Sequence, residues 1–176
     1  MVFARQPGRT DRWKSFFAFP DPVNEVSARV VAGGVVILAV ATLASRQLWL
    51  LVPIAYGFFA RVLTGPTLSP LGQLATRVVT PRLPVAPRPV AGPPKRFAQA
   101  MGLAMSSVAA ILGLGFGERT AAFVLTALIV VAATLESGFR LCLGCKVFAL
   151  LMRLGLIPAE VCERCNNIGG RPSPAG

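Results

Sequence analysis

Four stretches of 17 or more residues with almost no charged side chains constrain the fold of this chain more than any other feature. A helix needs roughly 20 apolar residues to cross the hydrocarbon core of a bilayer, and lengths of about 17 to 25 are usual. The pattern therefore predicts an all-α fold, a four-helix transmembrane bundle. The predicted spans are residues 27–44, 47–63, 97–116 and 120–136, the last reaching 139 if the helix continues through Ser137-Gly138.

The composition argues against a soluble protein with four buried helices. Apolar residues make up 54% of the chain and charged residues only 14%. Soluble domains carry roughly 25% charged residues, so this chain has too little polar surface to coat four apolar helices in water. Lipid is the better solvent for them.

The positive charges predict an orientation. The chain has 18 Lys and Arg against 7 Asp and Glu, a net charge of +11. If the spans alternate, all basic residues except Arg46 and Arg119 fall on one side, which the positive-inside rule assigns to the cytoplasm. Both termini are then cytoplasmic. Because the basic residues flank apolar segments, anionic lipid headgroups are the expected partner, and nucleic acid is not.

The spans and charges divide the chain into two helical hairpins with polar segments around them. Short turns at 45–47 and 117–119 make the helices of each hairpin antiparallel neighbours. Six prolines between residues 80 and 94 predict an extended stretch. The five segments are a basic cytoplasmic tail (1–26), hairpin 1 (27–63), a Pro-rich basic cytoplasmic connection (64–96), hairpin 2 (97–139) and a cytoplasmic cysteine tail (140–176).

Small residues recur every four positions in the third span. Ala98, Gly102, Ser106 and Ala110 form this stripe. Small side chains let membrane helices approach closely, because packing drives helix association in lipid. The stripe predicts a tightly packed bundle and carries no information on chemistry.

All four cysteines lie near the C-terminus, in two CxxC pairs separated by 16 residues. In soluble proteins this spacing indicates a zinc site, because four thiolates complete a closed tetrahedral structural site. The predicted cytoplasmic location disfavours structural disulfides. Zinc is therefore the candidate metal, with Cys142, Cys145, Cys162 and Cys165 as its ligands.

Thiol redox or sulfur chemistry is an equally open interpretation of the first pair. A break at Ser137-Gly138 would leave Cys142 near the N-terminus of the next helix. Helix N-termini and nearby cations, here Arg140 and Lys146, lower thiol pKa values. In this hypothesis Cys142 is the nucleophile and Cys145 resolves the mixed disulfide.

Glu136 is an accessory candidate, because an acid within a membrane span is a functional candidate by default. An ion pair with Arg140, one helical turn later, is its alternative role. The absence of histidine excludes Ser-His-Asp and Cys-His mechanisms. No pair of acids lies in the middle of the spans, so transport of charged solutes is not expected.

The chain also resembles a family of small bacterial integral membrane proteins, the family of domain of unknown function 4395 (DUF4395). The resemblance covers about residues 19–152 and implies a multi-pass membrane protein, here of a bacterial inner membrane. It implies no established activity. The residues that carry it are Asp21-Pro22-Val23-Asn24, Gly65-Pro66, Ser69-Pro70, Pro94-Lys95-Arg96-Phe97-Ala98, Leu135-Glu136, Gly138-Phe139 and Cys142-Leu143-Gly144-Cys145-Lys146.

These observations leave the function open between three classes. The first is a membrane-anchored thiol protein that exchanges electrons or sulfur with a thioredoxin-like or sulfurtransferase-like cytoplasmic partner. The second is a non-enzymatic membrane protein with a structural zinc site. The third is a membrane scaffold or assembly subunit, in which the cysteines are inert.

Overall fold

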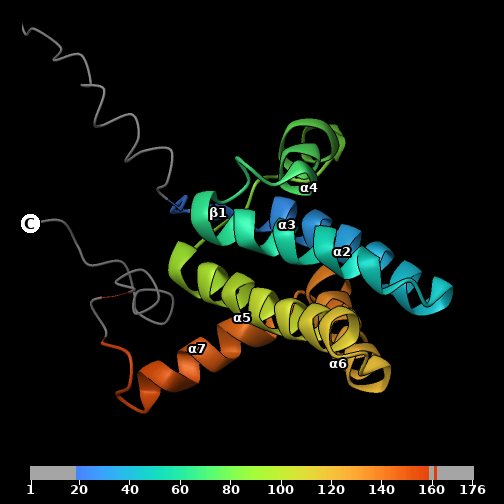
Figure 1. Ribbon diagram of the computed structural model, residues 1–176. Helices are drawn as coiled ribbons and strands as arrows, with labels where there is room; N and C mark the ends of the chain where they lie inside the picture. The colour runs from blue at the N-terminus through green and yellow to red at the C-terminus, as the bar shows by residue number, and fades with distance from the viewer. Residues whose placement is uncertain (1–18, 159–160, 162–176) are drawn as a thin grey trace, which may run out of the picture.

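The computed structural model of the protein describes residues 19–158 and 161, and they are mostly helical (Figure 1). Two π-helical segments, η2 and η4, and two 3₁₀ segments, η1 and η3, extend or join the α-helices. In chain order the elements are β1 (Val23–Asn24), α2 (Glu25–Ser45), η1 (Leu48–Leu50), α3 (Leu51–Thr64), α4 (Pro70–Gln73), η2 (Leu74–Val79), η3 (Thr80–Arg82), β2 (Pro89–Val90), α5 (Gly92–Ala110), η4 (Ile111–Gly115), α6 (Arg119–Phe139) and α7 (Leu143–Arg153).

Three helices are long and apolar enough to cross a membrane: α2, α5 with η4, and α6. The second predicted span is also helical, over Leu48–Thr64, but it is shorter than these three. All four predicted stretches are thus helices. Their outward side chains are strongly apolar; Ile37, Tyr56 and Val131 are among the large hydrophobic residues that are more than half exposed.

One predicted boundary differs from the structure by several residues, and a second, which the sequence left open, is decided by it. Helix α5 begins at Gly92, five residues before the predicted start, because Pro93 and Pro94 occupy its first turn, where the missing N–H groups have no intrahelical role. Ser137-Gly138 does not break α6, which continues to Phe139 and ends at Arg140 in the left-handed conformation (φ 60°).

The Pro-rich connection is also more helical than predicted. Residues 70–79, for which no structure was predicted, form the short helices α4 and η2, and η3 (Thr80–Arg82) begins the stretch that was predicted to be extended. Ser69 begins this stretch, since its hydroxyl accepts a hydrogen bond from the Gly72 amide (3.2 Å). Extended backbone is confined to the residues that follow Arg82 and precede α5.

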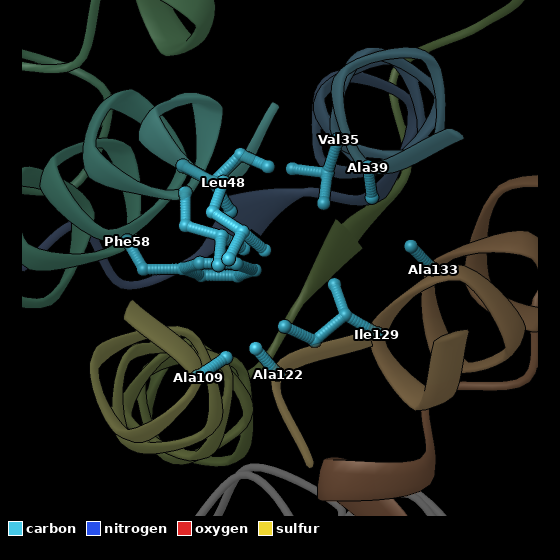
Figure 2. Packing of buried hydrophobic residues seen from close by; sticks show 10 residues of the cluster. Val35, Ala39, Leu48, Phe58, Ala109, Ala122, Ile129 and Ala133 are labelled. Carbon is cyan, nitrogen blue, oxygen red and sulfur yellow. The ribbon is translucent and has the colours of Figure 1, made fainter. Parts of the chain in front are cut away.

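The bundle is held together mainly by contacts between the two predicted hairpins. Helix α2 packs along α6, α3 packs along α5, and α5 also packs on α6, whereas α2 and α3 touch each other less. Figure 2 shows side chains of these helices converging on one core, among them Val35, Phe58, Ala109 and Ile129. Gly102 faces the Phe58 ring so closely that a Cβ atom there would lie 2.3 Å from it, which confirms the close approach predicted from the small-residue stripe.

A short antiparallel ladder ties the connection to the start of α2. Val23 pairs with Val90, and Asn24 pairs with Pro89. The Asn24 side chain also caps α2 by accepting from the Val26 amide (3.0 Å). The Asp21 carboxylate accepts from the Gly92 amide at the start of α5 (3.1 Å). These contacts bring the starts of α2 and α5 to the same end of the bundle.

Candidate functional site

The first cysteine pair lies where the chain turns from α6 into α7. Cys142 is the N-cap residue of α7, and its sulfur accepts from the Cys145 amide (3.3 Å). The two Sγ atoms are 2.6 Å apart, between the roughly 2.05 Å of a disulfide bond and ordinary van der Waals contact. Both cysteines are free thiols, so the pair is positioned to form and break a disulfide without a large movement.

The environment makes the two thiols unequal. A hydrogen bond from the Cys145 thiol lowers the pKa of Cys142, burial and Glu136 oppose this effect, and the Lys95 charge supports it. The same hydrogen bond raises the pKa of Cys145, with burial as the second cause. Cys142 is therefore the member of the pair that ionises first, and a thiolate is the nucleophilic form.

A buried ion pair lies beside the thiols. Lys95 Nζ, on the first turns of α5, is 2.6 Å from Glu136 Oε1, near the end of α6, and both side chains are mostly shielded from solvent. Breaking such a pair leaves an uncompensated buried charge, so this ion pair stabilises the contact between α5 and α6. Glu136 thus pairs with Lys95 and not with Arg140, the partner considered from the sequence.

Arg61 is the most deeply buried cation of this cluster, with only 5% of its surface exposed. Its Nε donates to Gln99 Oε1 (2.8 Å), its Nη1 donates to Ser69 Oγ (3.3 Å), and its guanidinium lies over the Phe58 ring (4.6 Å). Nη2 has no hydrogen-bond partner among the described residues. The segment after α3, which includes Ser69, folds back over Arg61 and covers it.

Cys142 borders two cavities. The inner cavity, of about 270 Å³, lies within the bundle and includes Arg61, Gln99 and Glu136 among its lining residues. The outer cavity, of about 330 Å³, is lined by both cysteines together with Lys95, Arg140 and Lys146. Residue Cys142 is therefore shared by a cavity within the bundle and by a second cavity that several basic residues line.

The docking of α7 on α5 positions this site. A Cβ atom added to Gly144 would lie 2.5 Å from the Ala98 Cα, so only glycine allows this approach. One turn further on, Phe148 is buried and packs on Phe97, with ring centroids 5.6 Å apart. These two contacts fix the first turn of α7, and with it Cys142 and Cys145, against the start of α5.

The structure thus brings most of the predicted site residues together. Cys142, Cys145 and Glu136 form one cluster, and the predicted cations Arg140 and Lys146 border its outer side. Cys162 and Cys165 lie outside the described residues. Within residues 19–158 and 161, no group of three or more Cys, His, Asp or Glu side chains could hold a metal ion.

Sequence reasoning missed the place of Lys95, Gln99 and buried Arg61 in this cluster. Lys95 and Glu136 are 41 positions apart, and Arg61 and Gln99 are 38 apart, so no local pattern connects them. One signal was available, because Ser69, Lys95 and Glu136 all belong to the motifs that carry the family resemblance. The fold gathers these separate motifs at one end of the bundle.

Fold and site together define a class: an all-helical protein with at least three helices apolar enough for a membrane and a cysteine pair at the polar end of the bundle. A family model described as Domain of unknown function (DUF4395) matches residues 23–153, so the chain belongs to this family, as the resemblance predicted. No curated protein and no solved structure matches the chain.

Proposed function

We propose that this protein spans the bacterial inner membrane four times and uses the Cys142/Cys145 pair to exchange disulfides or sulfur with a cytoplasmic protein. The single observation that carries the chemical part is the geometry of the pair, with sulfurs 2.6 Å apart at the first turn of α7. A partner with a thioredoxin-like or sulfurtransferase-like reactive cysteine would fit this geometry.

The membrane part is supported by three apolar helices, by a shorter fourth and by their exposed hydrophobic surface. The charges support an N-in, C-in orientation, because Arg29, Lys95 and the thiol pair share one end of the bundle, whereas the opposite turns hold only Arg46, Glu118 and Arg119. The positive-inside rule then places the cysteines in the cytoplasm.

The exchange reaction follows from the unequal thiols. The Cys142 thiolate attacks one sulfur of a partner disulfide, a mixed disulfide forms, and the other partner sulfur leaves as a thiolate. Cys145 then loses its proton and attacks Cys142 Sγ, which breaks the mixed disulfide. The products are a Cys142–Cys145 disulfide and a partner dithiol, a transfer of two electrons, and the reverse reaction uses the same steps.

Trapping the intermediate tests this proposal. The Cys145→Ala variant retains Cys142 but lacks the resolving thiol. In cells it should therefore accumulate a mixed disulfide, which a reductant cleaves. The matched control is the Cys142→Ala/Cys145→Ala variant, which should trap nothing. Absence of any Cys142 adduct in membranes that contain folded Cys145→Ala protein would refute the exchange function.

The pKa difference gives a second test in vitro. In a Cys162→Ala/Cys165→Ala background, reduced protein should alkylate at Cys142 first, as identified by mass spectrometry. Cys145→Ala removes the hydrogen bond that lowers the pKa of Cys142, so the pH at which alkylation accelerates should move upward. An unchanged pH profile would contradict the proposed role of Cys145.

The cysteine spacing favours one alternative, a structural zinc ion held by Cys142, Cys145, Cys162 and Cys165. This alternative predicts about one zinc ion per chain in protein purified without chelator. It also predicts that this zinc is lost when any single cysteine is replaced, because a structural zinc site takes four ligands. Zinc-free protein with four titratable thiols would exclude this alternative and leave the exchange function standing.

A further inference from the structure

Arg61, one of the residues that line the inner cavity, carries a buried hydrogen-bond donor that no described residue uses. Arg61 Nη2 is fully buried and unpartnered, although the same guanidinium donates to Gln99 and Ser69 through its other nitrogens. A buried polar group without a partner is costly, by roughly 1–3 kcal/mol, and such groups in native structures usually have a function. Arg61 lines this cavity, so a ligand with an acceptor oxygen would satisfy it.

The residues Arg61, Gln99 and Glu136 form the polar end of the cavity. The rest of the cavity is mainly apolar. Its walls include Val31, Val35, Met101, Met105 and Ile129, contributed by α2, α5 and α6. Its volume of about 270 Å³ is close to the lower limit of roughly 300 Å³ for small-molecule sites, which suits a ring-sized group. A small inorganic anion would leave most of these walls without contacts.

The cavity also reaches the outer surface of the bundle. Leu128 and Val131 on α6 belong to its lining, yet they are 51% and 55% exposed. If α6 crosses the membrane, these side chains face acyl chains. A ligand would then enter sideways from the lipid and not from water.

The charges at the polar end are not balanced by the protein. Lys95 and Glu136 neutralise each other, and Arg61 adds one positive charge without an acidic partner among the described residues. In a medium of low dielectric constant this surplus favours a group that becomes negative during its reaction.

From these observations we propose that the inner cavity binds a membrane quinone, with one carbonyl oxygen on Arg61, and that this quinone accepts the electrons of the Cys142/Cys145 dithiol. The redox step rests on the proposed thiol function; the binding step does not. A quinone combines the features that the cavity requires: an apolar ring, an acceptor oxygen, solubility in lipid and the capacity for two electrons.

The reaction balances within this site. The two S–H bonds of Cys142 and Cys145 break and one S–S bond forms, which releases two electrons and two protons. The quinone takes up the two electrons and the two protons, and its two C=O groups become the two C–OH groups of a quinol. The positive charge of Arg61 stabilises the negative charge that develops on the quinone oxygen before protonation. A cytoplasmic partner dithiol would then reduce the disulfide again.

Binding is tested with the purified full-length protein in lipid nanodiscs and with ubiquinone-1 and menadione as probes. The Cys142→Ala/Cys145→Ala protein should bind one quinone per chain in equilibrium dialysis. Arg61→Gln should weaken binding about tenfold, because it removes a charge-assisted hydrogen bond, whereas Arg61→Lys should retain part of the affinity. Decanoate, an apolar chain with a carboxylate, serves as the rival ligand.

Because Arg61 variants could fail to fold, a second pair of variants keeps Arg61 intact. Ala132→Phe fills the cavity from α6 and should abolish quinone binding. Ala127→Phe adds the same ring at an exposed position of α6 that does not line this cavity, and it should bind normally. Equal binding by these two variants, or binding of decanoate in preference to both quinones, would overturn the proposal.

Electron transfer is measured separately under anaerobic conditions. Reduced Cys162→Ala/Cys165→Ala protein with one equivalent of ubiquinone-1 should form one disulfide and one quinol, and Ala132→Phe should do so at least about tenfold more slowly. Binding without quinol formation would refute the redox step. A trapped mixed disulfide without quinone binding would refute only the quinone site, and quinone binding without a trapped partner would refute only the exchange function.

Discussion

Polar side chains inside the bundle are satisfied differently at its two ends. In the middle of the bundle and toward the 45–47 and 117–119 turns, buried hydroxyl groups donate to a carbonyl of their own helix, four residues earlier. These bonds are Thr42 to Leu38 (2.9 Å), Ser106 to Gly102 (2.7 Å) and Thr126 to Ala122 (2.7 Å). Such contacts satisfy a polar group without linking helices to one another.

At the end that carries Cys142 and Cys145 (the cysteine end), local bonds such as Thr64 to Ala60 also occur, but other polar contacts join residues far apart in the chain. Lys95 reaches Glu136, and Arg29 Nη2 donates to the Ser137 carbonyl, 108 residues away (2.7 Å). The comparison separates two tasks: apolar packing builds the bundle along its length, and long-range polar contacts fix the geometry of one end. The candidate site lies where the second task is concentrated.

The largest effect should come from breaking the ion pair of the cysteine end. Glu136→Gln leaves the Lys95 charge buried without a partner and should lower the free energy of unfolding by about 3 kcal/mol. Lys95→Met/Glu136→Leu removes both charges and should cost less than Glu136→Gln alone. Unfolding in mixed micelles at increasing SDS fraction measures these values. Glu118→Gln at the opposite end is the control, and a loss as large as that of Glu136→Gln would erase the distinction between the two ends.

A smaller effect is expected where α7 touches α5. Gly144→Ala forces a methyl group against the Ala98 backbone and should destabilise this docking by about 2 kcal/mol. Local undocking should make Cys145 alkylate faster, which mass spectrometry can follow. Gly138→Ala is the matched control, because nothing lies within 4 Å of its added Cβ atom. Equal alkylation rates in both variants would show that α7 is not held by this contact.

The smallest effect should come from Arg29. Its guanidinium donates to the carbonyl of Ser137, and the positive charge also suits the C-terminus of α6. Arg29→Gln should therefore cost about 1 kcal/mol of unfolding free energy, because the contact is only partly buried. Arg119→Gln, at the other end of α6, should cost less. The reverse order would contradict the assignment of the stabilising polar contacts to the cysteine end.

The apolar pattern was sufficient to predict the helices, because a run of about 20 apolar residues has few alternatives to a helix. The prediction that Cys142 lies at the N-terminus of the next helix is confirmed, but not for the reason given, because α6 continues through Ser137-Gly138 to Phe139. The helical segment 70–82 was not predicted, since prolines at both of its ends resemble a linker.

The site was predictable only in its cysteines and Glu136. The contact of Lys95 with Glu136 depends on how α5 packs on α6, which no local spacing encodes. The burial of Arg61 depends on a segment that folds back over the end of α3, so from the sequence it resembled an ordinary cation at the end of a span. Tertiary packing, and not residue type, gives these side chains their roles.

The shortness of the helix that carries Arg61 has a consequence for the surrounding lipid. The 17 residues Leu48–Thr64 extend about 25 Å, less than the roughly 30 Å of an average hydrocarbon core. If this helix crosses the membrane as proposed, the bilayer beside it must thin locally. Bilayers made from shorter acyl chains would then accommodate the protein with less deformation.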